Sequence, residues 1–464
     1  MADKPELRGL PVTVVGLGIE GIDLVRYLST EGAQVTVSDS RSEDALSGAL
    51  DAIADSISEH DVTLSLGANR ASDLVDAEVV FVSQGVPAEL PALQAALENG
   101  VPISSMTRLF FERCPAPIAG ITGSSGKTTT TALVASMLDA ADIDHVAGGN
   151  IGVGLLGLLD EIEPTTKVVV ELSHTQLESL DESPHVACVT NVTPNHLDQY
   201  PWADYVALKR RIFEYQHSDD LAIFNLDDPV CTEFAAESPG RVETTSMSQP
   251  LPGDGVALEG DTIVRRHDGA ATAVLTRSEI ALRGDHNVAN VLSALAVAHQ
   301  LGVPDDAAAT AIRSFTGVAH RLEPVATVRS VQYVNDSIAT TPERTLAGIR
   351  SYEEPLVLIL GGRDKDLPLS GLAVETARRC RAVIAFGEAG EQYAAVVRSA
   401  MTSDTPSVDV VIDVASATRM AAQRAVEGDV VLFAPAGTSF DAYPNFERRG
   451  EDFRDAVRQL EAGA

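Results

Sequence analysis

Short apolar runs alternate with amphipathic stretches along the chain. Residues 12–15 have the pattern of a buried strand, a helical pattern follows to about residue 30, and residues 34–38 have a second strand pattern that ends at Asp39. Strands that alternate with helices favour a parallel sheet covered by helices. The first part of the chain is therefore predicted to begin with a βαβ unit.

Two later blocks repeat this alternation. The second block has predicted strands at 117–122, 167–170 and 186–191, helices to about residue 138 and over 287–300, and turns with hairpins over 244–275. The third block starts near residue 317, with strands at 331–334, 356–360, 382–386 and 430–434. We predict an α/β chain of three domains: a Rossmann-like N-terminal domain over 1–106, a central P-loop ATPase-like domain with a parallel sheet over 107–317, and a Rossmann-like C-terminal domain over 318–464.

The composition narrows the function classes. The formal net charge is −33, which opposes binding to nucleic acid and to anionic membranes. No window is long and apolar enough for a membrane span, and the first apolar run is too short for a signal peptide. The cysteines are scattered without a CxxC pair, as expected for reduced thiols in a cytosolic protein. We expect a cytoplasmic monomer that neither inserts into membranes nor binds nucleic acid.

The first predicted turn has the spacing of a nucleotide-binding loop. The sequence from Gly16 to Gly21 matches GxGxxG between a strand and a helix, and Asp39 lies near the spacing of an acid that binds a ribose hydroxyl. Backbone N–H groups and the helix N-terminus of such a turn can approach a phosphate. A tight turn that merely needs small residues would have the same spacing, so the pattern alone is a weak signal.

A second glycine-rich loop carries a stronger signal. The sequence from Gly123 to Thr129 reads Gly-Ser-Ser-Gly-Lys-Thr-Thr after a predicted strand and before a predicted helix. In such a phosphate loop the backbone wraps the phosphates, Lys127 reaches the terminal phosphates and the Thr128 hydroxyl meets Mg²⁺. Glu171 follows another strand of this domain and is a natural Mg²⁺ ligand there, although a helix cap or surface charge is the alternative.

Lysine is rare in this chain. Only five of its 34 lysines and arginines are lysines. Three of the five, Lys127, Lys209 and Lys365, lie in segments that resemble catalytic or binding sites. An amine can act as a nucleophile when it is neutral, whereas a guanidinium stays charged. The tandem Lys-Arg-Arg at 209–211 also fits a solvated helix face, so both readings of Lys209 stay open.

Several further segments complete the pattern. Asn287 and Asn290 lie on one helical face and could read a purine edge or simply cap and pack. His196 follows a predicted strand, where a lone histidine is more often structural than a ligand. The remaining segments are His-Arg-Leu-Glu at 320–323, Asn-Asp-Ser at 335–337 and Ala-Gly-Thr-Ser-Phe-Asp at 436–441.

This ordered set of motifs resembles the Mur ligase family over essentially the whole chain. The resemblance implies ATP-dependent ligation in cell-wall precursor synthesis, with UDP-N-acetylmuramoyl-L-alanine and D-glutamate as substrates, ATP and two Mg²⁺ as cofactors, and a carbamylated Lys209. It assigns the catalytic and metal-binding roles to Lys127, Thr128, Glu171, His196 and Lys209. It assigns ATP to Gly123, Ser124, Ser125, Gly126, Lys127, Thr128, Thr129, Asn287, Asn290, Arg321 and Asp336. It assigns the UDP-sugar to Leu17, Ile19, Asp39, Ser40, Arg41, Ser83 and Asn150, and glutamate to Thr340, Lys365, Ser439 and Phe446.

Two departures from the family pattern bear on specificity. The familiar Asp-Ser-Lys-Ala-Thr-Asn stretch has Ile338 in place of its lysine, and the familiar Glu-Leu-Ser-Ser stretch has His174 at its end. Three alternatives therefore stay open: a ligase of this kind that adds L-glutamate, a folylpolyglutamate synthetase, and an NAD(P)-linked oxidoreductase or regulatory module built on the first GxGxxG. Folate ligases lack the predicted uridine-binding domain.

Overall fold

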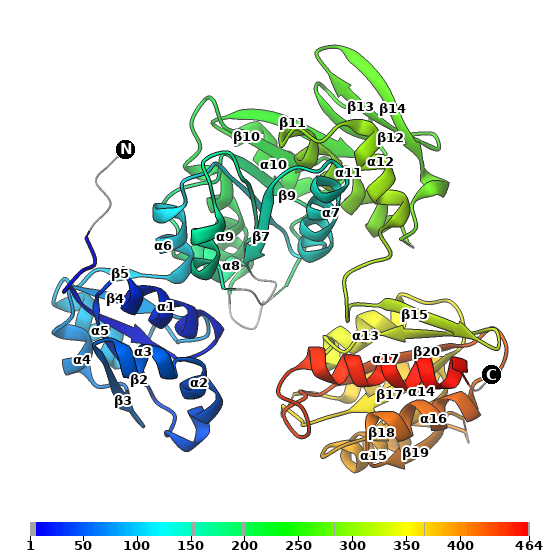
Figure 1. Cartoon of the computed structure of the whole chain (residues 1–464). Coiled ribbons are helices and arrows are strands. Elements are labelled where there is room, and N and C mark those ends of the chain that lie inside the picture. Colours follow the sequence, from blue (N-terminus) through cyan, green and yellow to red (C-terminus); the bar gives the residue numbers. More distant parts are fainter. Residues whose placement is uncertain are drawn as a thin grey trace. The chain divides into compact units, whose positions relative to one another are not determined.

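The computed structural model of the chain describes residues 6–149, 154–195, 200–282, 284–365, 367–403 and 405–462. The chain divides into two compact units, one ending at Phe315 and the other beginning at Thr316 (Figure 1). Within the described ranges, no helix is both long enough and apolar enough to cross a bilayer.

The first unit begins with a fully parallel sheet in the order β3-β2-β1-β4-β5. Its strands are β1 (Pro11–Val15), β2 (Gln34–Asp39), β3 (Val62–Leu66), β4 (Val79–Val82) and β5 (Ile103–Ser104). Its helices are α1 (Ile19–Thr30), α2 (Ser47–Ala52), α3 (Ala54–Glu59), α4 (Ala71–Val75), α5 (Pro91–Glu98) and α6 (Met106–Arg113). Val12 and Val14 pack with the core under α1, whereas Val15 packs with α5, so successive strand residues bury opposite faces of the sheet.

The rest of the first unit is built on a sheet in the order β14-β13-β12-β11-β10-β9-β6-β8-β7. Its strands are β6 (Ile118–Thr122), β7 (His145–Gly149), β8 (Lys167–Glu171), β9 (Val186–Val189), β10 (Leu221–Asn225), β11 (Arg241–Ser246), β12 (Gly255–Glu259), β13 (Thr262–His267) and β14 (Ala270–Thr276). Its helices are α7 (Lys127–Ala140), α8 (His174–Glu178), α9 (Trp202–Glu214), α10 (Pro229–Glu237), α11 (Asp285–Gln300) and α12 (Asp305–Ser314). Among the described strands of this sheet, only the pairs β12–β13 and β13–β14 are antiparallel, and they are the predicted hairpins.

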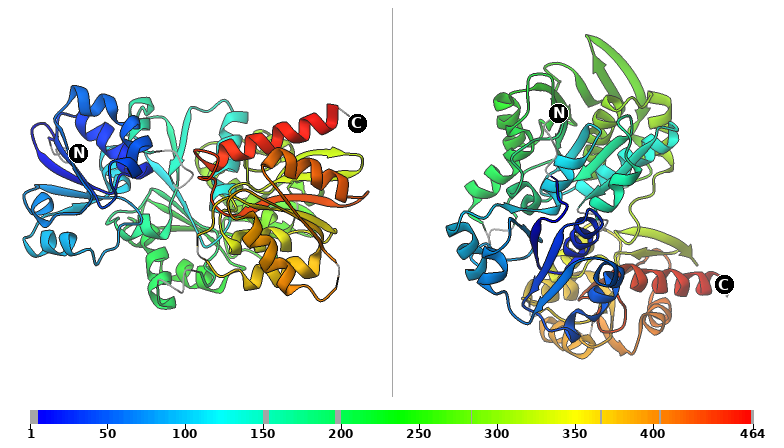
Figure 2. Two further views of the ribbon diagram at one scale, coloured as in Figure 1. Left: turned by 90° about the horizontal axis from the view of Figure 1, so that it is seen from below. Right: turned by 60° about the vertical axis from the view of Figure 1, so that its left-hand side comes forward.

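The second unit has a sheet in the order β15-β16-β20-β17-β18-β19. Its strands are β15 (Glu323–Val328), β16 (Val331–Asn335), β17 (Leu356–Gly361), β18 (Cys380–Phe386), β19 (Ser407–Val411) and β20 (Val430–Ala436). Its helices are α13 (Pro342–Arg350), α14 (Ser370–Arg379), α15 (Gly390–Ala400), α16 (Val414–Arg424) and α17 (Phe446–Ala462). Residues of α16 and α17 pack in one core cluster and residues of α13, α14 and α15 in the other. The ribbons of these two sets of helices cover opposite faces of the sheet (Figure 2).

The predicted fold class is confirmed: three α/β sheets follow one another, and the predicted central sheet is parallel apart from its hairpin edge. Several strands run one or two residues beyond their predicted ends, so that Asp39 and Glu171 are the last residues of β2 and β8. The cysteines are free thiols, and burial raises the pKa values of Cys188 and Cys380 to about 12. The boundaries at 106 and 317 stay predictions.

Candidate functional site

The first glycine-rich turn lies where the carboxyl ends of β1 and β4 meet. In the strand order of this sheet, β1 is the point from which the connections run in both directions, and ligands bind outside the strand ends at such a switch point. A Cβ on Gly21 would lie 2.0 Å from the Gly16 carbonyl oxygen, so the turn requires glycine. The Ser83 hydroxyl donates to the same carbonyl at 2.6 Å. Ile19, the first residue of α1, is 63% exposed and offers an apolar surface at the turn.

Asp39 ties this turn to the loop after β2. One carboxylate oxygen accepts from the Leu17 N–H at 2.8 Å, and the Arg41 guanidinium donates to both oxygens at 3.0 and 2.7 Å. Burial raises the pKa of Asp39, but the hydrogen bonds from Arg41 and Leu17 outweigh burial and hold the pKa below its ordinary value. Ser40 is exposed beside this pair. Leu17, Ile19, Asp39, Arg41 and Ser83 therefore converge on one end of the sheet.

The second glycine-rich loop joins β6 to α7, as predicted. Gly123 and Gly126 have φ of +151° and +83°, and a Cβ on them would lie 2.0 Å from the Thr190 Oγ1 and 2.2 Å from the Asn290 Oδ1, respectively. Lys127 Nζ donates to the Gly123 carbonyl oxygen at 3.0 Å and folds back over the loop. Thr128 and Thr129 continue into the first turn of α7, so their backbone N–H groups stand at a helix N-terminus.

The loop is held by the strand on its other side. The Ser124 N–H donates to the Asn191 carbonyl oxygen at 2.9 Å, and the Ser125 N–H donates to the Asn191 Oδ1 at 2.9 Å. Asn290 Nδ2 donates to the Asn287 Oδ1 at 3.1 Å, so the two predicted adenine-binding amides face each other on α11. Asn290 is thus both a wall of the phosphate loop and a partner of Asn287.

Lys209 is buried among the residues of the phosphate loop. It is 1% exposed, which excludes the solvated helix face, and its Nζ donates to the Thr122 Oγ1 at 3.0 Å at the end of β6. Burial, followed by the positive charge of Lys127, lowers the pKa of Lys209 well below its ordinary value, although Glu171 partly opposes this. Glu171 is also 1% exposed. The site therefore combines a buried carboxylate with an amine whose neutral form is favoured.

An aromatic pair adjoins the loop on the same helix as Lys209. The Tyr205 ring lies 5.5 Å from Lys209 Nζ, and its hydroxyl is 3.1 Å from the Ser124 Oγ. Trp202 stacks on Tyr205 with ring centroids 6.1 Å apart. Sequence reasoning missed Tyr205, although its position one helical turn before Lys209 was a usable signal.

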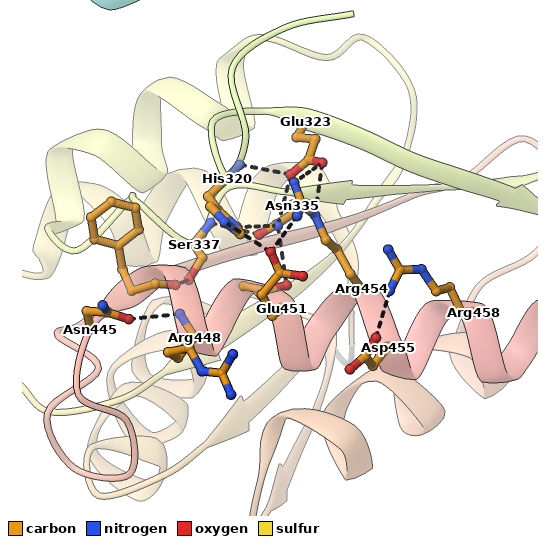
Figure 3. Close-up of polar contacts among 12 residues, drawn as sticks. His320, Glu323, Asn335, Ser337, Asn445, Arg448, Glu451, Arg454, Asp455 and Arg458 are labelled. Atoms are coloured by element: carbon orange, nitrogen blue, oxygen red, sulfur yellow. Dashed lines mark hydrogen bonds and ion pairs between the residues drawn. The ribbon is translucent and has the colours of Figure 1, made fainter. Parts of the chain in front are cut away.

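The second unit holds the remaining predicted residues. Arg321 lies between His320 and Leu322, whose φ values of +61° and +41° are uncommon for residues other than glycine. A buried network secures this segment: His320 Nδ1 lies 2.9 Å from the Asn335 Nδ2, and the His320 N–H donates to the Glu323 Oε2 at 2.8 Å (Figure 3). The segment that carries Arg321 is thereby fixed to the sheet and to α17.

The residues predicted to bind glutamate surround the carboxyl ends of β16, β17 and β20. Thr340 is half-buried after β16, Lys365 is exposed after β17, and Ser439 is 2% exposed after β20. Phe446 begins α17, and its carbonyl oxygen accepts from the Ser337 hydroxyl at 2.7 Å. Asp336, which is predicted to contact ATP, follows β16. Burial raises its pKa to about 6, although the Leu322 N–H, Arg321 and Arg344 act against this.

Arg449 organises these strand ends and was missed in the sequence. It is 0% exposed and donates from Nε to the Ser337 Oγ, from Nη1 to the carbonyl oxygens of Gly437 and Thr438, and from Nη2 to the Ser337 carbonyl oxygen. Nothing in the tandem Arg-Arg at 448–449 indicates which of the two is buried. Two predicted residues, Asn150 and His196, lie outside the described residues.

Comparison with known proteins assigns three family domains along the chain. Residues 11–105 match the Mur ligase MurD-like N-terminal domain, residues 121–298 the Mur ligase middle domain, and residues 320–437 the Mur ligase glutamate ligase domain. The chain is 37% identical to the UDP-N-acetylmuramoylalanine–D-glutamate ligase of Acetivibrio thermocellus, over 99% of this chain and 98% of that protein. It is 38% identical to the protein of the same name from Symbiobacterium thermophilum, over 96% and 97%. The chain belongs to the Mur ligase family.

Solved structures of Mur ligases share the fold. The UDP-N-acetylmuramate-alanine ligase MurC of Thermotoga maritima matches with a TM-score of 0.58 and 18% identity, over 98% of this chain and 100% of that one. MurF of Acinetobacter baumannii matches with a TM-score of 0.56 and 16% identity, over 82% and 91%. At these identities the likeness establishes the Mur ligase fold alone.

Proposed function

We propose that this chain is an ATP-dependent ligase that joins D-glutamate to UDP-N-acetylmuramoyl-L-alanine in the synthesis of peptidoglycan precursors. The proposal rests on the end-to-end relationship with ligases of that name, at 37% and 38% identity. The phosphate loop with its buried lysine supplies the chemistry that such a ligation requires. The reaction of a dinucleotide-dependent oxidoreductase does not require this phosphate loop.

The first domain binds the sugar nucleotide in this proposal. The diphosphate of the sugar nucleotide binds at the turn that begins with Gly16, beside the N-terminus of α1. The exposed side chain of Ile19 contacts the uracil base. Asp39 and Arg41 fix the shape of the pocket through the hydrogen bond to Leu17, and Asn150 contributes from the central domain.

The central domain activates the carboxylate of the L-alanine residue. That carboxylate oxygen attacks the γ-phosphorus of ATP, the bond from this phosphorus to the β-phosphate oxygen breaks, and an acyl phosphate and ADP form. Lys127 and the loop N–H groups hold the phosphates and stabilise their charge. Asn287 and Asn290 bind the adenine, and Arg321 and Asp336 are further ATP contacts in this proposal.

The donors at this loop fit Mg²⁺, which prefers oxygen ligands. Glu171 offers a buried carboxylate at the end of β8, and Thr128 offers a hydroxyl in the first turn of α7, which follows the neighbouring strand β6. The strands β6 and β8 are paired in register at Ile121 and Glu171. His196 is the further expected ligand. When bound, Mg²⁺ neutralises charge on the transferred phosphoryl group.

Lys209 is carbamylated in this proposal. A neutral amine nitrogen attacks the carbon of CO₂ and loses a proton, which leaves an N-carboxylate in place of a buried cation. The lowered pKa of Lys209 favours the neutral amine that this reaction needs. The resulting carboxylate adds a second oxygen donor beside Glu171 and removes the repulsion from Lys127, consistent with two Mg²⁺ sites.

The second unit binds the incoming glutamate in this proposal. The glutamate amine attacks the acyl carbon, the amide bond forms, and inorganic phosphate leaves. Lys365, Thr340 and Ser439 bind the amino acid, and Phe446 shapes the pocket. Ile338 lies next to this site, in place of the lysine of the family pattern.

The proposal is tested by phosphate release from ATP in the presence of UDP-N-acetylmuramoyl-L-alanine. Parallel reactions contain D-glutamate, L-glutamate or no amino acid, and mass spectrometry identifies the product. We expect amide product and phosphate release with D-glutamate. A kcat/KM for L-glutamate equal to or greater than that for D-glutamate would reject D-specificity, and phosphate release without any amide product would reject the ligase.

A further inference from the structure

Three cations gather at the strand ends of the second unit. Lys365 follows β17, Arg344 lies in the first turn of α13, and Arg449 comes from α17. Burial and then the positive charges of Arg344 and Arg449 lower the pKa of Lys365, so the charges are close enough to repel one another. In a chain with a net charge of −33, a local concentration of positive charge indicates a site for an anion.

The three cations differ in how accessible they are to a ligand. Arg449 is 0% exposed, and all three of its guanidinium nitrogens donate to groups of the chain. It shapes the loops but cannot reach solvent. Arg344 and Lys365 are both exposed, so the guanidinium of one and the amine of the other can contact a bound molecule.

Arg344 is anchored beside the predicted glutamate residues. Its Nη1 donates to the Ile338 carbonyl oxygen at 3.3 Å, in the loop that leads from β16 to Thr340. The Ile338 side chain itself carries no charge. Arg344 therefore provides, next to position 338, the positive charge that the Ile338 side chain lacks. Arg344 lies in α13, which begins two residues before it at Pro342.

The substrate requires more than one cation. Glutamate carries two carboxylates, and its amine must be neutral to attack the acyl phosphate, so both negative charges have to be met by the protein. A guanidinium presents a planar fork that binds a carboxylate through two N–H groups. Lys365 alone supplies a single compact charge.

We propose that Arg344 binds a carboxylate of the incoming glutamate and shares with Lys365 the recognition of its two negative charges. This inference rests on the proposed ligase function. It makes Arg344 a specificity-determining residue of the amino-acid site, in addition to the residues that the family pattern assigns to that site.

The test compares Arg344→Gln with Arg344→Lys and with Arg350→Gln. Arg350 is an exposed arginine in the last turn of the same helix, so its variant matches the change in charge. Steady-state kinetics on D-glutamate, ATP and the sugar nucleotide are measured for each protein, together with the melting temperature. Arg344→Gln is expected to raise the KM for D-glutamate by about tenfold or more, and to leave the other two KM values within about twofold.

The controls separate the possible outcomes. Arg344→Lys should recover part of the loss, Arg350→Gln should behave as wild type, and Lys365→Ala should show the same selective rise in the KM for glutamate. An unchanged KM for D-glutamate in Arg344→Gln overturns the inference, as does an equal rise in all three KM values with a lowered melting temperature, because that pattern indicates a structural role. If the wild-type protein forms no amide product, the proposed function has failed instead.

Discussion

Replacing Lys209 with methionine separates the chemistry of this residue from its packing. The side chain is 1% exposed, so a substitution must fit a closed space, and methionine has a similar length and volume. The variant loses the hydrogen bond to the Thr122 hydroxyl, a contribution of about 0.5–1.5 kcal/mol. That hydroxyl keeps its own bond to the Leu172 carbonyl oxygen at 2.7 Å. The substitution of Lys209 therefore leaves the buried Thr122 hydroxyl with a hydrogen-bond partner.

The electrostatic effect of the substitution on stability has the opposite sign to the loss of this hydrogen bond. Since the folded pKa of Lys209 lies below the ordinary 10.5, the unfolded chain binds more protons between the two values, and stability rises with pH in that interval. The cost of burying the amine is complete below the folded pKa, and methionine removes it. We therefore expect Lys209→Met to melt, near neutral pH, at or above the temperature of wild-type protein that has been freed of CO₂ and whose Lys209 is an unmodified amine. Lys209→Arg should melt lower, because a guanidinium stays charged beside Lys127.

Activity should respond quite differently from stability. Without a carbamate, Lys209→Met is expected to lose about 10²–10³-fold or more in kcat, the range for removing one group that stabilises transition-state charge. Arg210→Met is the matched control, because Arg210 is only partly buried on the same helix and pairs with Glu237. In Lys209→Ala, a short added carboxylate such as acetate should restore part of the activity.

A direct observation of the carbamate completes the test. Wild-type protein in ¹³C-bicarbonate should give a carbamate resonance by NMR that is absent in Lys209→Met and present in Arg210→Met. Retention of wild-type kcat in Lys209→Met, or the absence of any such resonance in active wild-type protein, would refute the reasoning.

Three further predictions address the other sites. Asp39→Asn should weaken binding of the sugar nucleotide by about 1.5–3 kcal/mol and leave the KM for ATP unchanged, as measured by calorimetry and kinetics; a loss of NADH binding instead would show that the first domain was misread. Gly126→Ala should abolish ATP binding, because the new Cβ would lie 2.2 Å from the Asn290 Oδ1, whereas Gly253→Ala meets nothing within 4 Å and should bind ATP normally. Asp336 has a pKa raised from 3.8 to about 6, so the folded protein binds more protons than the unfolded chain between these values and loses stability as pH rises through them. Melting curves from pH 4 to 7 should show a smaller decline for Asp336→Asn, and an unchanged decline would contradict this account.

The elements that could be predicted from the sequence are those with strong periodicity. Apolar runs such as 12–15 and 356–360 are buried on both sides by helices, so their pattern is continuous and their assignment holds. The edge strand Ser407–Val411 was not predicted, because its residues are only partly buried and alternate with aspartate. Several strand ends were predicted too early, since a polar residue such as Glu171 can complete a strand, whereas the strand predicted over 186–191 ends already at Val189.

The candidate site was predictable where the backbone dictates its chemistry, as at Gly123 and Gly126, whose conformations exclude other residues. Side-chain burial was not predictable. The sequence at 209–211 gives a lysine and two arginines in one helix, and only the packing of α9 against the phosphate loop determines that Lys209 is the buried one. The clustering of Arg344 with Lys365 depends on how α13 and the loop after β17 approach each other, which no local pattern specifies.

Trp202 gives the protein an intrinsic optical reporter. It is the only tryptophan in the sequence, so tryptophan emission comes from one position without labelling or mutagenesis. Its indole is partly exposed and stacked on Tyr205, whose hydroxyl is 3.1 Å from the Ser124 Oγ of the phosphate loop. A rearrangement of that loop on nucleotide binding changes the surroundings of the ring and therefore its emission. Stopped-flow fluorescence of the unmodified protein can thus resolve the time course of events at this loop.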